Sequence, residues 1–451
     1  MLSIRSRFVA VAFFMLVFGW AQAQITTDVI RPKNNSPYSR FGLGDPVDQY
    51  LASASGMAGL SAAYQDAFHL NLLNPASLAY LQATAFELGF YAKYASLSGN
   101  DNSIGIWSGN INYISLGFPI KNPINKILDR DKTPFGWGMN FALLPYSLVG
   151  YSVETTSTEP DLGQISNTLK GNGGSYRLYW GNGVRYGSLA IGANLGYQFG
   201  KITNSRKVEF DSIAFAYRTE LLDEISISGF VWNVGAQYTI DFKEENEDGE
   251  LVSSGNKIII GAYGNSTSSF NTNTSSFYHR DNFDYGQIDT IINQFDILQK
   301  GTMPSEWTLG VAYERLNKFR LGMEYTTSNW SQYENEAKPE ILSDAFRFAF
   351  GGEFIPDIIS YNNYFRRVRY RFGAFYATDP RTIDGVQLKE YGITFGAGFP
   401  IIMPRQQTSF VNLALEIGQF GLADALRETY FKMTLGFTLN DNTWFFKRKF
   451  N

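Results

Sequence analysis

Apolar and polar side chains alternate along most of the chain, from about residue 83 onward. In the segment Leu189–Gly200 (LAIGANLGYQFG), every second residue is apolar and the residues between them are small or polar. Because successive side chains of a strand point to opposite faces, this pattern predicts a strand with one apolar and one polar face. Other polar faces carry full charges, such as Glu87 and Lys93, which suits a wet or salt-bridged lumen better than a dry sandwich core.

The alternation recurs in about fourteen segments, which predicts an all-β membrane protein, an antiparallel transmembrane β-barrel of about 14 strands. The segments are 83–97, 108–119, 134–153, 173–186, 189–208, 224–241, 256–269, 303–315, 319–332, 341–354, 363–378, 387–399, 408–419 and 428–441. An even count places both chain ends on one side, the periplasm in barrels of this type. The longest connection, 271–302, is then expected to be an outer loop, and Glu87 is expected to pair with Lys432 across the closing seam.

Residues 1–23 have the features of a secretory signal peptide. Arg5 and Arg7 precede an apolar run, Phe8–Trp20, and Ala21-Gln22-Ala23 is a small-x-small cleavage site. The run of about 13 residues is short of the roughly 20 that span a bilayer as a helix, which argues against the alternative of a membrane anchor. An exported chain built of alternating strands is expected in the outer membrane.

Composition excludes several kinds of chemistry. The chain has 451 residues, of which 18% are charged and 16% are aromatic, and its net charge of −4 gives no case for a nucleic-acid partner. It has no Cys and only two His, which leaves little for thiolate, metal or triad chemistry. His279 falls in the expected outer loop, where a solvated role is favoured over a catalytic one. We therefore expect no enzyme activity, no cofactor and no metal site.

Residues 24–82 break the alternation and form a separate segment before the predicted barrel at 83–451. The segment is rich in Gly, Pro and small residues, which suits a hatch or plug packed inside the lumen. A periplasmic extension is the alternative. Gly56 and Gly59 are plausible hinges of a moving hatch, and Asn74-Pro75 is a turn signal.

The pattern from Gly56 to Leu81 (GMAGLSAAYQDAFHLNLLNPASLAYL) resembles the hatch of the long-chain fatty-acid transporter (FadL-type) family of outer-membrane barrels. Residues 303–313 and 321–333 are similar to two strand segments of that family, and SPYSRFGLGDP near the start is similar to its Bacteroidota branch. The resemblance implies a fourteen-stranded barrel with an N-terminal hatch that passes hydrophobic molecules sideways into the membrane. The family's ligand-contacting residues do not align with this chain, so none is carried over.

Two functions follow as hypotheses. The first is passive uptake of a hydrophobic small molecule, gated by the hatch, with membrane lipids as surroundings. The alternative, implied by the Bacteroidota branch, is a plugged barrel that transports nothing and is a subunit or partner of an outer-membrane type 9 protein-secretion complex.

One charged cluster stands out on the predicted strands. Arg367, Arg369 and Arg371 share one face, and that face is expected to be lumenal because arginine on the lipid face costs about 2–4 kcal/mol near mid-bilayer. These arginines could bind a substrate carboxylate or an acidic hatch residue. The favoured interpretation is structural, with lumenal salt bridges to acidic wall residues; the candidates are Glu353, Glu324 and Glu416.

Overall fold

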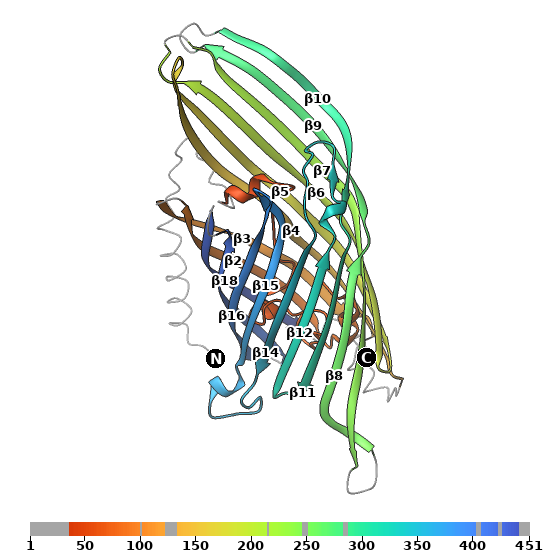
Figure 1. Cartoon of the computed structure of the whole chain (residues 1–451). Coiled ribbons are helices and arrows are strands. Elements are labelled where there is room, and N and C mark those ends of the chain that lie inside the picture. Colours follow the sequence, from red (N-terminus) through yellow and green to blue (C-terminus); the bar gives the residue numbers. More distant parts are fainter. Residues whose placement is uncertain are drawn as a thin grey trace, which may run out of the picture. The chain divides into compact units, whose positions relative to one another are not determined.

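Fourteen antiparallel strands close into a barrel (Figure 1). The computed structural model describes residues 36–99, 102–121, 133–213, 216–245, 251–282, 287–402, 407–422 and 426–441, all within one unit, Pro32–Asn451. The predicted signal peptide, 1–23, lies outside these residues. The barrel strands are β2 (Thr84–Gly99), β3 (Asn102–Pro119), β4 (Phe135–Glu159), β5 (Gly163–Tyr186), β6 (Leu189–Phe210), β7 (Arg218–Glu245), β8 (Leu251–Asn265), β11 (Glu306–Arg315), β12 (Phe319–Ser328), β14 (Ala345–Phe354), β15 (Arg369–Ile383), β16 (Val386–Ile402), β17 (Thr408–Gly421) and β18 (Arg427–Asp441). Pairing of β18 with β2 closes the ring, so the predicted strand count and fold class are confirmed.

The closing seam is held by a different ion pair from the predicted one. Lys432 lies opposite Lys93, and Glu87 lies opposite Thr438. Lys93 instead pairs with Glu428, which lies four residues along β18 from Lys432. The expected Glu87–Lys432 pair is wrong because the register separates these two residues along the strands.

Alternation of side chains produces an apolar outer wall and a polar inner wall. On β6, Leu189, Ile191 and Leu195 are about half exposed, whereas the intervening Asn194 and Gln198 are buried. The apolar stretch of β6, 189–199, spans about 25 Å along the membrane normal at the usual rise and a tilt of about 40°. This height matches the hydrocarbon band of an outer-membrane barrel.

The barrel strands β4, β5, β6 and β7 continue far beyond this apolar band (Figure 1) and, together with a hairpin, form a sheet that we call the extension. β4, β5, β6 and β7 have 25, 24, 22 and 28 residues, whereas β11 and β12 have 10 each. Beyond Phe199, the outward residues of β6 become polar, and Lys201 pairs with Glu224 of β7 at 2.8 Å. A polar outer face places the extension outside the hydrocarbon.

The remaining strands of the extension, β9 (Ser268–Asn282) and β10 (Gln287–Met303), form a hairpin. β9 pairs with β7 over Arg218–Ser228, directly above the part of β7 that pairs with β8. The predicted outer loop 271–302 is therefore wrong. These strands are outside lipid, and their apolar residues are irregularly spaced, so they lack the regular apolar alternation on which the prediction rested.

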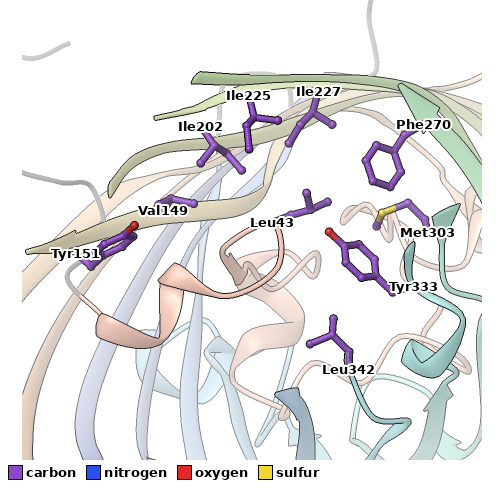
Figure 2. Close-up of a cluster of buried hydrophobic side chains, with 10 residues drawn as sticks. All are labelled: Leu43, Val149, Tyr151, Ile202, Ile225, Ile227, Phe270, Met303, Tyr333 and Leu342. Atoms are coloured by element: carbon purple, nitrogen blue, oxygen red, sulfur yellow. The ribbon is translucent and has the colours of Figure 1, made fainter. Parts of the chain in front are cut away.

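A buried apolar cluster joins the base of the extension to the segment before the barrel (Figure 2). Leu43 points into the space between two groups of side chains. Ile202, Ile225 and Phe270 come from the extension strands, whereas Tyr333 and Leu342 come from the connection between β12 and β14. β13 (Glu334–Asn335) follows Tyr333 and pairs with β10 at Gly301–Thr302. The cluster thus fixes the extension relative to the mouth of the barrel.

Residues 36–83, which we call the N-terminal segment, contain little regular structure. They include η1 (Pro37–Arg40), β1 (Asp45–Pro46), α2 (Ala52–Ser55) and η2 (Pro75–Tyr80). Among the described residues, no helix is both long enough and apolar enough to cross a bilayer. Most of the N-terminal segment from Leu51 to Leu81 is buried against the inner wall.

Candidate functional site

Glycines on the inner wall allow the backbone of the N-terminal segment to touch the strands directly. At eight of them a Cβ atom would lie under 3.0 Å from a backbone atom of that segment. We call this set the glycine belt: Gly136, Gly138, Gly183, Gly192, Gly261, Gly351, Gly373 and Gly396. A methyl group on Gly373, for example, would lie 2.5 Å from the amide nitrogen of Ala58. Because backbone cannot rotate away as a side chain can, larger residues are excluded at these positions.

Polar side chains of the wall satisfy the backbone of the N-terminal segment. Glu324 on β12 accepts hydrogen bonds from the amides of Ser61 (2.8 Å) and Ala62 (3.0 Å). Asn194 and Asn233 donate to the carbonyls of Leu72 (2.7 Å) and Leu73 (2.8 Å). A segment with only a two-residue strand and no long helix leaves most backbone groups without internal partners, so these wall residues supply the hydrogen bonds that secondary structure would supply elsewhere.

The structure brings two of the three arginines of the predicted face to the lumenal side of the wall. Arg369 and Arg371 are buried on the lumenal face of β15. Arg369 pairs with Asp66 of the N-terminal segment at 2.6 Å, and Arg371 pairs with Glu353 of β14 at 2.8 Å. Arg367 lies before the strand, in η4 (Tyr364–Arg367), because β15 begins later than predicted.

Of the acidic candidates, only Glu353 pairs with these arginines. Glu324 binds the backbone amides described above, and Glu416 lies 3.9 Å from Lys432 and accepts a hydrogen bond from Tyr430 at 2.8 Å. Lys432 also pairs with Asp48 of the N-terminal segment.

His69 joins the arginine pairs to the N-terminal segment. The Arg371 guanidinium donates to Oδ1 of Asn412 (2.7 Å), so Nδ2 of that amide faces Nε2 of His69 (3.1 Å). Nε2 must then accept, and the Nδ1 proton of His69 is directed at Asp66 (3.2 Å). Burial lowers the pKa of His69, which agrees with a neutral ring. Burial alone would raise the pKa of Asp66, but Arg369 and His69 hold it well below its usual range.

The predicted hinge and turn residues lie at the points of closest packing. Gly56 lies against Gly396, and a Cβ added at Gly396 would lie 2.9 Å from the Gly56 Cα atom. Gly59 has a φ of +76° and lies under the ring of Tyr50. Asn74 caps η2 by accepting from the Ala76 amide at 3.2 Å, and it donates to the Ala62 carbonyl at 2.7 Å. Pro75 touches the glycine belt at Gly183 and Gly192.

A cavity of about 290 Å³ lies above the packed part of the N-terminal segment. Its lining includes Val47 and Leu72 of that segment, Arg177 of β5, and Val231 and Trp232 of β7. The Arg177 guanidinium stacks 3.5 Å from the centroid of the Tyr146 ring and donates to Gln198 at 3.0 Å. Groups of the protein therefore already occupy this guanidinium.

The cavity reaches a break in the pairing of the wall. β7 pairs with β9 up to Ser228 and with β8 from Val234, so residues 229–233 have no ladder partner on this side. Asn265 at the end of β8 and Ser268 at the start of β9 line the same cavity. Phe230, in the break, is 79% exposed on the lipid-facing side. No feature of the sequence indicates this break, because β7 alternates without interruption through it.

The closed antiparallel fold and its apolar outer band define a transmembrane β-barrel of the outer-membrane type. The chain belongs to the BamG family, whose model matches residues 4–451. No curated protein matches the chain in sequence.

Three solved structures show the same fold at low identity. The Pseudomonas putida toluene transporter TodX is 16% identical, with a TM-score of 0.51 and coverage of 88% of this chain and 99% of TodX. A Pseudomonas aeruginosa FadL homologue is 12% identical, with a TM-score of 0.52 and coverage of 88% and 98%. The monoaromatic hydrocarbon channel CymD is 13% identical, with a TM-score of 0.51 and coverage of 89% and 99%. The fold resemblance predicted from the sequence is therefore confirmed.

Proposed function

We propose that this protein is an outer-membrane channel for passive uptake of an uncharged hydrophobic small molecule. The single observation that carries the proposal is the cavity that extends from the N-terminal segment to the pairing break at 229–233 of β7. A cavity of about 290 Å³ is at the small end of the range for ligand sites. The resemblance to hydrocarbon channels agrees with this function.

The proposed route leaves the barrel through its side. The glycine belt and the wall hydrogen bonds hold residues 56–79 against strands around the barrel, which closes the straight path. A molecule in the cavity can instead pass between Val231 and Asn265 toward the lipid-facing side. Transfer of an apolar molecule into the hydrocarbon lowers its free energy, so no energy source is needed.

The lining disfavours an anionic ligand, because it includes the carboxylates of Asp48, Glu306, Glu324, Asp379 and Glu390. Val231, Trp232 and Met303 offer apolar surface near the break. The two arginines of the cavity are occupied, since Arg177 is bound as described and Arg347 donates to the Ala58 carbonyl at 2.8 Å. An anionic ligand would have to displace one of these contacts.

The proposed gate is the stretch 46–50, which lines the cavity. Arg381 holds its N-terminal end by binding Asp45 and the Tyr38 carbonyl, the latter at 2.8 Å. Packing of Gly56 against Gly396 holds its C-terminal end. Asp48 and Gln49 are also held, by Lys432 and by the Pro145 carbonyl (2.9 Å), so the movable part is the Tyr50 side chain. Tyr50 rests on Gly59, and its rotation about that contact would widen the cavity.

A reversible cross-link across the break tests the route. The chain has no Cys, so Asn233→Cys with Asn265→Cys introduces a single thiol pair. We expect oxidation to slow the entry of the fluorescent hydrophobic probe 1-N-phenylnaphthylamine into cells at least roughly fivefold. Dithiothreitol should restore the rate.

The matched control is Ile240→Cys with Ile258→Cys, a paired position on the same two strands outside the break. Its oxidation should leave probe entry unchanged. Equal rates for the oxidised and reduced Asn233/Asn265 pair would overturn the lateral route, and equal rates in cells with and without the protein would overturn the uptake function.

A further inference from the structure

The free edge of the extension carries a row of exposed apolar side chains. On β10, Ile288, Ile291, Phe295 and Leu298 are 68%, 50%, 65% and 78% exposed. Edge strands in water normally carry Lys, Pro or other charged residues that prevent pairing with other chains. Residues 287–299 of β10 contain neither Lys nor Pro, and their two charged residues are bound by β9, Asp289 by Arg280 (2.6 Å) and Asp296 by Asn273 (3.0 Å).

The opposite edge of the same sheet has the expected protection. The outer part of β4, 152–159, carries only Val153 as an aliphatic side chain among Ser, Thr and Glu. The contrast shows that exposed apolar residues are not a general property of the extension. They are concentrated on β10.

The backbone of β10 is available for pairing beside these side chains. In the described residues, β10 pairs on its outer side only with β13, at Gly301 and Thr302. Lys300 continues this contact, because its amide donates to the Glu336 carboxylate (2.9 Å) and its carbonyl accepts from the Glu336 amide (3.0 Å). Backbone groups alternate in direction along a strand, so the amide and carbonyl of Leu298 point to the same open edge.

Lipid cannot cover this edge. Unpaired backbone groups in hydrocarbon cost several kcal/mol each, so a strand edge of this kind is not tolerated there. The neighbouring outer faces are also charged, with Lys201 paired to Glu224 and Arg218 paired to Asp281. A polypeptide can satisfy both features at once, since its backbone pairs with the edge and its side chains cover the apolar row.

We propose that β10 is a docking edge on which a segment of a second, different protein adds as a further strand. The segment would continue the line of β13 along β10 and cover Phe295 and Leu298 with apolar side chains. Register shifts at Thr290/Ile292 and Gln294/Ile297 interrupt the edge. Backbone pairing with the partner segment is therefore centred on Leu298, and the other contacts along the apolar row are made by side chains.

A second copy of this chain does not fit the same edge. Antiparallel pairing of two identical edges requires a twofold axis perpendicular to the sheet. The extension continues the barrel wall, so this axis lies in the plane of the membrane. The second barrel would then point away from the membrane that holds the first.

Site-specific photo-cross-linking in cells tests the docking edge. Phe295→p-benzoylphenylalanine places the cross-linker in the apolar row, and Ser226→p-benzoylphenylalanine on the polar outer face of β7 is the matched control. We expect a discrete adduct to one other protein from position 295 and none from position 226. The cross-linked peptide of the partner should map to a segment of alternating apolar residues.

Two further substitutions separate strand addition from side-chain contact alone. Leu298→Pro removes the edge amide, whereas Leu298→Ala retains it. We expect the adduct to fall roughly tenfold with Pro and clearly less with Ala. Heat-dependent gel mobility verifies that both variants are folded. Equal losses would overturn strand addition, and adducts only to lipid, to a second copy of the chain, or to nothing would overturn the partner.

Discussion

Substitution of Gly373 by alanine tests whether the N-terminal segment is fixed to the wall by the glycine belt. The added methyl group would lie 2.5 Å from the Ala58 nitrogen and 2.6 Å from the Met57 carbonyl carbon. Ordinary contacts begin near 3.4 Å, so this peptide must move by about 1 Å. The movement stretches the bonds from the Ala58 amide to Thr394 (3.0 Å) and from Arg347 to the Ala58 carbonyl (2.8 Å).

The cost follows from these contacts. Overpacking costs about 1–3 kcal/mol, a neutral hydrogen bond about 1 kcal/mol and a charged one about 1.5–3 kcal/mol, so we expect a loss on the order of 4 kcal/mol. Ser53→Cys supplies a reporter, because Ser53 is fully buried and its hydroxyl makes no hydrogen bond. Maleimide labelling of this thiol should be at least roughly a hundredfold faster with Gly373→Ala, since 1.4 kcal/mol corresponds to a factor of ten.

Gly322 provides the control for this experiment. A Cβ there meets the N-terminal segment only at the end of the Leu60 side chain, 3.3 Å away, which can rotate aside. Gly322→Ala should therefore label as slowly as the parent reporter. If Gly373→Ala labels at that slow rate too, the segment is not held by backbone contact with the wall.

Three other substitutions test the lumenal contacts and the cavity. Asp66→Asn leaves Arg369 without its nearest carboxylate and should cost about 3–5 kcal/mol, measured as a lower urea midpoint, whereas an unchanged midpoint would show the pair to be dispensable. The folded pKa of His69 is lowered, so stability should fall as the pH drops below the unfolded value of about 6.5, by at most about 1.4 kcal/mol per pH unit. His69→Gln should abolish that slope between pH 7 and 5.5, and a slope that persists would assign it to another group. Val231→Trp should fill the cavity beside the break and slow the entry of 1-N-phenylnaphthylamine, and the circular dichroism spectrum of the variant should stay unchanged. Undiminished entry of the probe would contradict the proposed route.

The sequence predicted the barrel well because its signal is repeated. Alternation over many strands identified the strand number, and the outward residues of β6 are apolar as expected. Prediction failed where this signal is absent. β9 and β10 are outside lipid, so nothing in their pattern distinguished them from a loop. Their pairing with β7 is a tertiary contact that no local pattern encodes.

The lumenal contacts were harder to predict than the strands. The charges of Arg369 and Arg371 indicated lumenal salt bridges, but their partners depend on register and on the path of the N-terminal segment. The ion pair between Arg369 and Asp66 joins residues that are far apart in the chain, so it could be identified only from the structure. The sequence shows the wall glycines as small residues on polar faces, but it does not show that they touch the backbone of the N-terminal segment. Association with a secretion complex and hinge motion at Gly56 remain predictions.

The glycine belt also constrains the order in which the molecule can assemble. The N-terminal segment precedes β2, the first strand of the barrel. β2 pairs with β18, the last strand, and this pairing closes the barrel. Backbone contacts on several sides leave no clearance for that segment to slide in lengthwise through a finished cylinder. The sheet must therefore close around the N-terminal segment, and the seam between β2 and β18 can seal only after that segment is in place.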